Sequence, residues 1–188
     1  MRTVRSKNTS TVIATQRGFT LVELVVVILI IGVLAVSAAS RFDSTGYAEY
    51  SYQSRLLSAL RAMQQRAMQD TRANYCFQIN FNTTNPSYGP PTLSYRNNTP
   101  AEHTATCATT INYATPEFLR TSSGEIAADG IGMNTLDTGN GAFNWIRFDS
   151  LGRPLTSAGS CQATCRITFQ GTQSPSVCVE SEGYIREC

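Results

Sequence analysis

The sequence predicts an α+β protein in which a long N-terminal helix, with its first half in a membrane, packs on an antiparallel β-sheet. Three observations support this class. Residues 19–39 form an apolar stretch, residues 40–72 contain an amphipathic helical pattern, and residues 73–188 contain short strand-like runs separated by turn residues. Residues 1–18 precede them as a basic leader. We expect these four segments to be the domains, and the last of them to be a globular head.

The apolar stretch reads FTLVELVVVILIIGVLAVSAA and contains a single charge, Glu23. A helix of this length extends about 30 Å at 1.5 Å per residue, which matches the hydrocarbon core of a bilayer. Many of its residues are β-branched, which would favour a strand in water. In lipid, a spanning segment must satisfy its own backbone hydrogen bonds, so we expect a transmembrane helix.

Charge is distributed unevenly around this stretch. The leader carries Arg2, Arg5, Lys7 and Arg17 and no acid, whereas the chain beyond residue 18 carries 11 arginines, no lysine and 13 acids. The positive-inside rule therefore keeps the leader in the cytoplasm and exports the remainder. The faintly acidic body lacks the one-sided basic surface of a nucleic-acid-binding protein, so we do not expect nucleic acid as a partner.

Two ordinary interpretations of the N-terminal segment explain less of it. A cleavable secretory signal has an apolar region of 7–15 residues, which is shorter than the stretch observed here. An uncleaved signal anchor explains the length and the orientation but leaves Glu23 unexplained. A carboxylate within a spanning helix costs about 3 kcal/mol on insertion scales, so such a charge is usually retained because it has a partner.

The segment GFTLVE, Gly18–Glu23, follows a basic leader and precedes an apolar helix. This arrangement resembles the class III signal of type IV prepilins and pseudopilins, and it implies a pilin-like fold. By this resemblance, a membrane aspartyl peptidase cuts between Gly18 and Phe19 and the new terminal Phe19 is N-methylated. Thr20 and Glu23 are assigned to assembly, with Glu23 pairing with the Phe19 amine of a neighbouring subunit in apolar surroundings.

The same resemblance implies the partners and the location. The partners are membrane lipid before assembly, the prepilin peptidase, an inner-membrane assembly platform, and other pilin subunits that pack through the N-terminal helix. The protein would be a single-pass inner-membrane protein of a Gram-negative bacterium with a periplasmic head, and would then enter an extracellular pilus.

The amphipathic segment predicts a helix from Tyr47 to about Thr71, after a short break that ends at Gly46. Together with the apolar stretch it suggests a helix of some 50 residues. Its apolar positions recur at helical spacing: Leu56, Leu60, Met63 and Ala67. Four arginines lie mostly off this stripe, and we expect a solvated face, with contact to neighbouring subunits or an anionic ligand as the alternative: Arg55, Arg61, Arg66 and Arg72.

Alternating patterns predict strands in the head, with a loop over Asn82–Pro91 and a tight turn at Glu182-Gly183. The expected strands are Tyr75–Phe81, Thr92–Arg96, Thr109–Tyr113, Phe143–Phe148, Arg166–Gln170, Val177–Glu180 and Gly183–Arg186.

The six cysteines all lie on the exported side: Cys76, Cys107, Cys161, Cys165, Cys178 and Cys188. We expect disulfides rather than a metal site, because the compartment is oxidising, His103 is the only histidine, and Cys161 and Cys165 have CxxxC rather than CxxC spacing. Six cysteines allow 15 pairings, and the sequence does not choose among them.

No catalytic chemistry is expected. His103 lies in a polar segment, and neither a phosphate-binding loop nor a dinucleotide motif is present, so we expect neither an enzyme nor a cofactor. One weak alternative is a calcium site, because oxygen-bearing side chains cluster in one region: Asp129, Asn134, Asp137, Asn140 and Asp149. Asp and Asn beside Gly are first of all turn formers, and the spacing is not that of an EF-hand.

Two features of the mature chain resemble minor subunits of this class. Phe148–Pro154 and the final strand pair, Val177–Arg186, resemble the head shared by pseudopilin H and the FimT and FimU pilins. The helix phrase Tyr52–Met68 is most similar to a minor pilin of mannose-sensitive haemagglutinin pili. These features imply a minor structural subunit involved in pilus assembly, initiation and surface attachment. The alternatives are a minor pseudopilin of type II secretion, and a tip adhesin or DNA-binding minor pilin.

Overall fold

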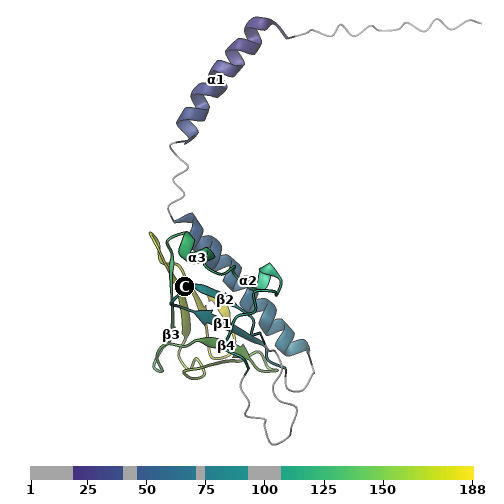
Figure 1. Cartoon of the computed structure of the whole chain (residues 1–188), viewed down its shortest axis with the longest axis vertical. Coiled ribbons are helices and arrows are strands. Elements are labelled where there is room, and N and C mark those ends of the chain that lie inside the picture. The colour runs from purple at the N-terminus through teal and green to yellow at the C-terminus, as the bar shows by residue number, and fades with distance from the viewer. Residues whose placement is uncertain (1–18, 40–45, 71–74, 93–106) are drawn as a thin grey trace, which may run out of the picture. The chain divides into compact units, whose positions relative to one another are not determined.

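The computed structural model describes residues 19–39, 46–70, 75–92 and 107–188 (Figure 1). The chain divides into two compact units, Met1–Asp43 and Ser44–Cys188, which are considered separately. The second unit is the globular head. The described residues do not include His103, Arg72 or the part of the predicted break before Gly46. The prediction of one continuous helix of some 50 residues also depends on residues 40–45, which are not described.

The first unit contains helix α1, Leu21–Ala39. It begins where the Leu24 N–H donates to the Thr20 carbonyl at 3.1 Å. The large apolar side chains from Leu21 to Leu34 are exposed within the unit, from 79% at Leu21 to 41% at Val25. No helix within the described residues is both long enough and apolar enough to cross a membrane.

The first element of the second unit is helix α2, Tyr47–Gln69, which starts after Gly46 and is followed by its C-cap residue, Asp70. The predicted apolar stripe is confirmed, since Leu56, Leu60, Met63 and Ala67 are at most 3% exposed. Burying one such leucine contributes about 2 kcal/mol, so this face is a main source of the head's stability.

Two four-stranded antiparallel sheets make up the rest of the head. The first has the order β2-β1-β4-β5, with β2 at Ser87–Gly89, β1 at Gln78–Asn82, β4 at Trp145–Phe148 and β5 at Pro154–Thr156. The second has the order β3-β6-β7-β8, with β3 at Gly132–Asp137, β6 at Cys165–Gln170, β7 at Ser176–Val179 and β8 at Ile185–Glu187.

Helix α2 contacts strands of both sheets, and Figure 1 shows it running along their side. Two short elements also lie on this helix: the 3-10 turn η2, Glu117–Leu119, and helix α3, Glu125–Ala128. The core between helix and sheets is continuous and includes Ile79, Phe143, Ile146, Ile167, Phe169 and Val177, each 0% exposed. The predicted α+β class with a helix covering antiparallel strands is confirmed for the head.

Individual strands agree with the sequence prediction only in part. The predicted strands that end at Phe81, Phe148 and Gln170 and the final pair correspond to β1, β4, β6, β7 and β8. The predicted loop over Asn82–Pro91 is confirmed for the turn at residues 83–86 and is wrong for Ser87–Gly89, because β2 lies there and pairs with β1 in a hairpin. The predicted strand Thr109–Tyr113 is also wrong, since only an isolated bridge joins Ile111 to Pro91.

The strand predicted at Thr92–Arg96 falls mostly outside the described residues. Strands β3 and β5 were not expected. Around β3, aspartate and asparagine beside glycine favour turns. Long-range pairing of β3 with β6 along six residue pairs overrides this local preference.

Gln64 fastens two tight turns to α2. Its Nε2 donates to the carbonyls of Gly152 at 2.8 Å and Gly183 at 2.6 Å. The predicted Glu182-Gly183 turn is confirmed: the Gly183 N–H donates to the Glu180 carbonyl at 2.9 Å, and Gly183 has a φ of 88°. A Cβ at this position would collide with the Gly152 carbonyl oxygen, so only glycine fits.

Replacing Gln64 with leucine should destabilise the head by about 1–3 kcal/mol, because two half-buried carbonyls lose their donor. Urea unfolding followed by the fluorescence of Trp145 measures this change. Gln65→Leu is the matched control, since Gln65 is exposed on the next position of the same helix. Equal stability of the two variants would contradict the role of Gln64.

Candidate functional site

The start of α1 carries the residues that the sequence assigns to assembly. The Glu23 N–H donates to Thr20 Oγ1 at 3.2 Å, so Thr20 caps the helix. Threonine at the cap and glutamate three residues later have the spacing of a capping box. A carboxylate in the first turn also interacts favourably with the helix dipole. Glu23 is therefore compatible with the helix geometry, despite the apolar surroundings in sequence.

Phe19 precedes this cap and is 80% exposed. Gly18 lies outside the described residues. Apart from Thr20, the described side chains around Glu23 are exposed apolar groups, among them Val22, Leu24 and Val26. An exposed surface that is apolar around the whole helix needs lipid or other protein to cover it. The site can thus offer one carboxylate at the end of a helix that requires a partner.

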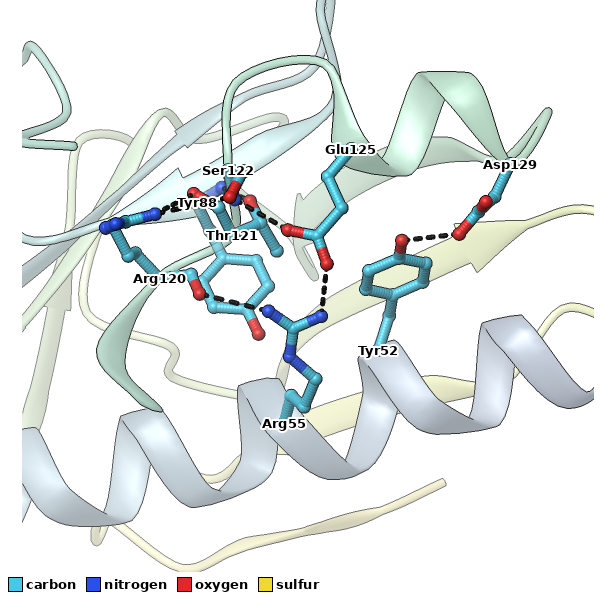
Figure 2. Close-up of polar contacts among 8 residues, drawn as sticks. All are labelled: Tyr52, Arg55, Tyr88, Arg120, Thr121, Ser122, Glu125 and Asp129. Atoms are coloured by element: carbon cyan, nitrogen blue, oxygen red, sulfur yellow. Dashed lines mark hydrogen bonds and ion pairs between the residues drawn. The ribbon is translucent and has the colours of Figure 1, made fainter. Parts of the chain in front are cut away.

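A second set of polar residues joins α2 to α3 in the head (Figure 2). Arg55 lies at its centre: Nη1 donates to Glu125 Oε1 at 2.5 Å, and Nη2 donates to the Arg120 carbonyl at 3.3 Å. The Ser122 N–H donates to the other oxygen of Glu125 at 2.7 Å. Together these bonds hold the segment before α3, and the start of α3 itself, against α2.

Tyr52 makes the second connection one helical turn away. Its hydroxyl donates to Asp129 Oδ2 at 2.6 Å, and its ring stacks on Phe169 with centroids 6.0 Å apart. Tyr88 lies behind Arg55 in Figure 2 and is 1% exposed. Its backbone is paired with Thr121, whose Oγ1 accepts the Tyr88 N–H at 3.1 Å. These contacts join α2 to Asp129 and β2 to Thr121, which are far apart in sequence.

Burial and charge shift the pKa values of this set in consistent directions. Burial raises the pKa of Tyr52, and the bond to Asp129 raises it further. Partial burial would raise the pKa of Glu125, but the hydrogen bonds from Arg55 and from Ser122 outweigh it, so that pKa lies below its usual value. Tyr52 therefore stays neutral and Glu125 stays charged at physiological pH, which are the states that these contacts require.

Glu49 connects α2 to the β6–β7 hairpin. It is 3% exposed and accepts the Gln173 N–H at 3.2 Å. Hydrogen bonds from its own backbone N–H and then from that of Gln173 lower its pKa. A Cβ at Gly171 would collide with the Glu49 side chain, so a larger residue at position 171 would require that side chain to move.

The three described arginines of α2 differ in their exposure to solvent. Arg55 pairs with Glu125, and Arg61 donates to the Ile185 carbonyl at 2.9 Å. Arg66 lies over the ring of Phe118, 5.8 Å from its centroid. The expectation of a solvated face is confirmed for Arg61 and Arg66, which are exposed. It is wrong for Arg55, which is partly buried and connects α3 to the helix through Glu125.

The predicted disulfides are confirmed, and the structure gives the pairing that the sequence left open. The pairs are Cys76–Cys107, Cys161–Cys165 and Cys178–Cys188. Asp137 lies beside the second, with its carboxylate and both sulfurs within 4.8 Å of one another. Since both sulfurs are bonded to each other, they cannot also act as thiolate ligands.

The structure does not bring the oxygen ligands of the suggested calcium site together. Asp129 precedes β3 and accepts the Tyr52 hydroxyl, whereas Asp137 ends β3, and a strand of this length extends about 17 Å. Asp149 instead accepts the N–H of Arg153 at 2.8 Å within its own turn. Asn134 lies on an exposed position of β3, and Asn140 lies in the turn after Asp137.

Asp137 is 0% exposed. Its Oδ2 accepts the Cys161 N–H and the Thr156 hydroxyl, each at 3.2 Å. Its Oδ1 has no hydrogen-bond partner within the described part of the chain. These bonds hold the turn after β3 against the Cys161–Cys165 segment.

Sequence reasoning missed the buried amides that position the head. Gln53 donates to the Ser176 carbonyl at 2.6 Å, and Gln64, Gln78 and Asn80 make similar bonds to backbone carbonyls. One signal was present in α2, where Gln53 and Gln64 lie at helical spacing beside the apolar stripe. A polar residue that continues a buried stripe needs a partner in the core.

Comparison with known proteins supports the interpretation of the N-terminus. Residues 13–39 match the model of the prokaryotic N-terminal methylation motif. No curated protein and no solved structure matches the chain. The motif indicates a protein of the type IV pilin or pseudopilin class, for which the signal implies processing by a prepilin peptidase and assembly with other pilins. The matched residues do not include the head.

A double-mutant cycle of Arg55→Ala and Glu125→Ala should give a coupling of about 0.5–1 kcal/mol. The value is modest because 37% and 30% of the two side chains are exposed to water. Urea unfolding of the four proteins measures it. Arg153 and Asp149 are the control pair, with 54% and 41% exposed, and their coupling should be smaller. A larger coupling at the control pair would contradict this assignment.

The stability of the head should fall as the pH is lowered through about 4. The folded-state pKa values of Glu49, Glu125, Asp149 and Glu180 are all lowered, so their contributions are present above the unfolded pKa and are lost as the carboxylates protonate. Unfolding curves between pH 3 and pH 7 test this.

The Glu125→Gln variant should be less stable than the native protein at neutral pH. This difference in the free energy of unfolding should become smaller towards acid pH, because Glu125 of the native protein is then protonated. Glu117→Gln is the control, since the Glu117 carboxylate makes no hydrogen bond among the described residues. A pH dependence that is unchanged by Glu125→Gln would show that Glu125 does not contribute to it.

Proposed function

We propose that this chain is a minor structural subunit of a type IV pilus, similar to the minor pilin MshC of mannose-sensitive haemagglutinin pili. It helps to initiate and assemble the filament, and thereby supports surface attachment. The observation that carries the proposal is the capped N-terminus of α1. There a single carboxylate, Glu23, lies in the first turn of a helix whose described apolar side chains are exposed.

The mechanism is transfer of an apolar helix from lipid to a helix bundle. Cleavage after Gly18 leaves a positive amine on Phe19, and Glu23 supplies the negative partner to the amine of a neighbouring subunit. Neither charge is favourable alone in apolar surroundings, but together they neutralise each other. Because apolar contacts between helices have little directional preference, this pair sets the register of an incoming subunit.

Thr20 supports this role by defining where the helix begins. Its hydroxyl accepts the Glu23 N–H, which fixes the first turn and therefore the position of the Glu23 side chain relative to Phe19. A helix that started one residue later would rotate Glu23 by about 100° around the axis. Thr20 is thus a positioning residue for the charge pair.

The proposed location follows from the same segment. The stretch 19–39 anchors the chain once in the inner membrane, with the head in the periplasm, until an assembly platform extracts it into the pilus. The prepilin peptidase acts on the precursor before this step. Three disulfides in the head are consistent with an exported compartment.

The head supports assignment to the minor subunits. The two segments on which that resemblance depends, Phe148–Pro154 and Val177–Arg186, lie together in space. Both are bonded to Gln64 of α2, through the carbonyls of Gly152 and Gly183. The resemblance therefore concerns one structural feature rather than two separate phrases.

Glu23→Ala should leave membrane insertion and cleavage after Gly18 intact but abolish incorporation into filaments, because the Phe19 amine of the neighbour loses its counter-charge. Insertion is measured by membrane fractionation, cleavage by mass spectrometry of the N-terminus, and incorporation by immunoblotting of sheared filaments.

Glu23→Asp is the matched control, since it keeps a carboxylate at the same position and should retain partial incorporation. Normal incorporation of Glu23→Ala would overturn the proposed mechanism. Failure of the native chain to be cleaved between Gly18 and Phe19 would overturn the proposed function itself.

A further inference from the structure

A cleft of about 480 Å³ lies at one end of the first sheet, beside the β1–β2 turn. Its volume is within the range of small-molecule sites. None of the described residues that line it is acidic or basic. Its polar lining consists of amides, hydroxyls and one phenol, which include Asn82, Thr83, Thr84, Thr109, Tyr113 and Asn144. Phe81 and Ile111 supply apolar surface.

One wall of the cleft is a segment without regular secondary structure that is held by buried groups. Asn80 is 0% exposed, and its Nδ2 donates to the carbonyls of Ala108 at 3.0 Å and Thr110 at 3.1 Å. Gln78, 2% exposed, donates to the Asn80 Oδ1 at 2.6 Å. The Cys76–Cys107 disulfide fixes the start of the same segment. This wall is therefore preorganised.

The aromatic ring at the rim of the cleft is fixed in the same way. Tyr113 is 38% exposed, and its hydroxyl lies 3.1 Å from Ser87 Oγ, within hydrogen-bond distance. The preceding Asn112 closes a turn by accepting the Ala114 N–H at 3.0 Å. The ring is held by its backbone at one end and by its hydroxyl at the other, while part of it stays open to solvent. A fixed ring loses little entropy when a ligand packs on it.

Several residues that line the cleft offer hydrogen-bonding groups that no described residue uses. Asn82 Oδ1 accepts the N–H groups of Thr84 at 3.1 Å and Asn85 at 3.0 Å, which fixes the side chain. Its Nδ2 has no acceptor among the described residues, and within that part of the chain the hydroxyls of Thr83, Thr84 and Thr109 also have no partner. The cleft thus presents oriented donors and acceptors to a ligand.

We propose that this cleft binds a neutral carbohydrate. The open Tyr113 ring can pack against the apolar C–H face of a sugar, and the amides and hydroxyls can bond to its hydroxyl groups. A phosphate-bearing ligand would find no cation here, so a nucleic acid is disfavoured. A cationic peptide would find no carboxylate. The inference goes beyond assembly, because it assigns the head a ligand of its own.

The larger cleft between α2 and α3 does not share these properties. It is lined by Glu49, Arg55, Glu125 and Asp129, which already bond to the protein itself. Its charged groups hold the fold together, whereas several polar groups of the smaller cleft have no such task. This difference favours the smaller cleft as a ligand site.

The test uses the full processed chain in a zwitterionic detergent, because sugar-headed detergents would compete for the site. The probes are glucose, galactose, mannose, N-acetylglucosamine and N-acetylgalactosamine, with disaccharides of each, measured by saturation-transfer NMR and titration. We expect at least one of them to bind. Tyr113→Ala should weaken that binding by about tenfold or more, which corresponds to the loss of one well-packed aromatic contact.

Two further variants separate the site from the fold. Asn82→Asp keeps the acceptor that closes the β1–β2 turn but removes the two N–H donors, and Thr109→Val removes one exposed hydroxyl. Each should weaken binding several-fold without changing the circular dichroism spectrum. Tyr184→Ala is the control, because Tyr184 is also an exposed tyrosine, 64% accessible, but does not line the cleft. It should bind as the native chain does.

Three results would overturn the proposal. The first is no binding of any probe by the folded native chain. The second is binding that Tyr113→Ala, Asn82→Asp and Thr109→Val leave unchanged. The third is tighter binding of a single-stranded oligonucleotide at the cleft, which would assign it to a different class of ligand. Assembly into filaments is read out separately, so failure here leaves the assembly proposal standing.

Discussion

Burial of one face of α2 against both sheets is the interaction on which the head depends. Leu56 and Leu60 are 0% exposed and form part of one continuous core with residues of either sheet. Polar side chains of the same helix hold other segments of the head by hydrogen bonds. Glu49 bonds to the β6–β7 hairpin, Arg55 bonds to Glu125 at the start of α3, and Gln64 bonds to two tight turns. Apolar burial supplies the stability, and the polar bonds decide which loop lies where.

The same division of roles explains how irregular segments are positioned. The segment after Cys107 contains no strand in its described part, yet buried amides and a disulfide hold it against β1. Burying Asn80 and Gln78 would be unfavourable unless their amides found partners, so each restricts the neighbouring chain to one arrangement. Such groups hold a cleft wall in place.

Helix α1 follows the opposite rule. Its described apolar side chains are exposed within its own unit, and Glu23 with its Thr20 cap is the one charged feature among them. Apolar surface without a partner inside its own unit needs a partner outside that unit. The head buries its apolar side chains in a core of its own, whereas the described apolar side chains of α1 are exposed within their unit.

The sequence by itself determined the N-terminal methylation motif, the buried stripe of α2, and the class of the fold of the head. These features depend on local spacing and on partition between water and apolar surroundings, which short segments encode directly. Only the tertiary structure decided the disulfide partners, the pairing of β3 with β6, the tasks of Arg55 and Gln64, and the gathering of Asn82, Thr109 and Tyr113 around one cleft. The physical reason is that each of these depends on residues far apart in the chain meeting in the folded head, where buried polar groups must find partners that no local pattern specifies.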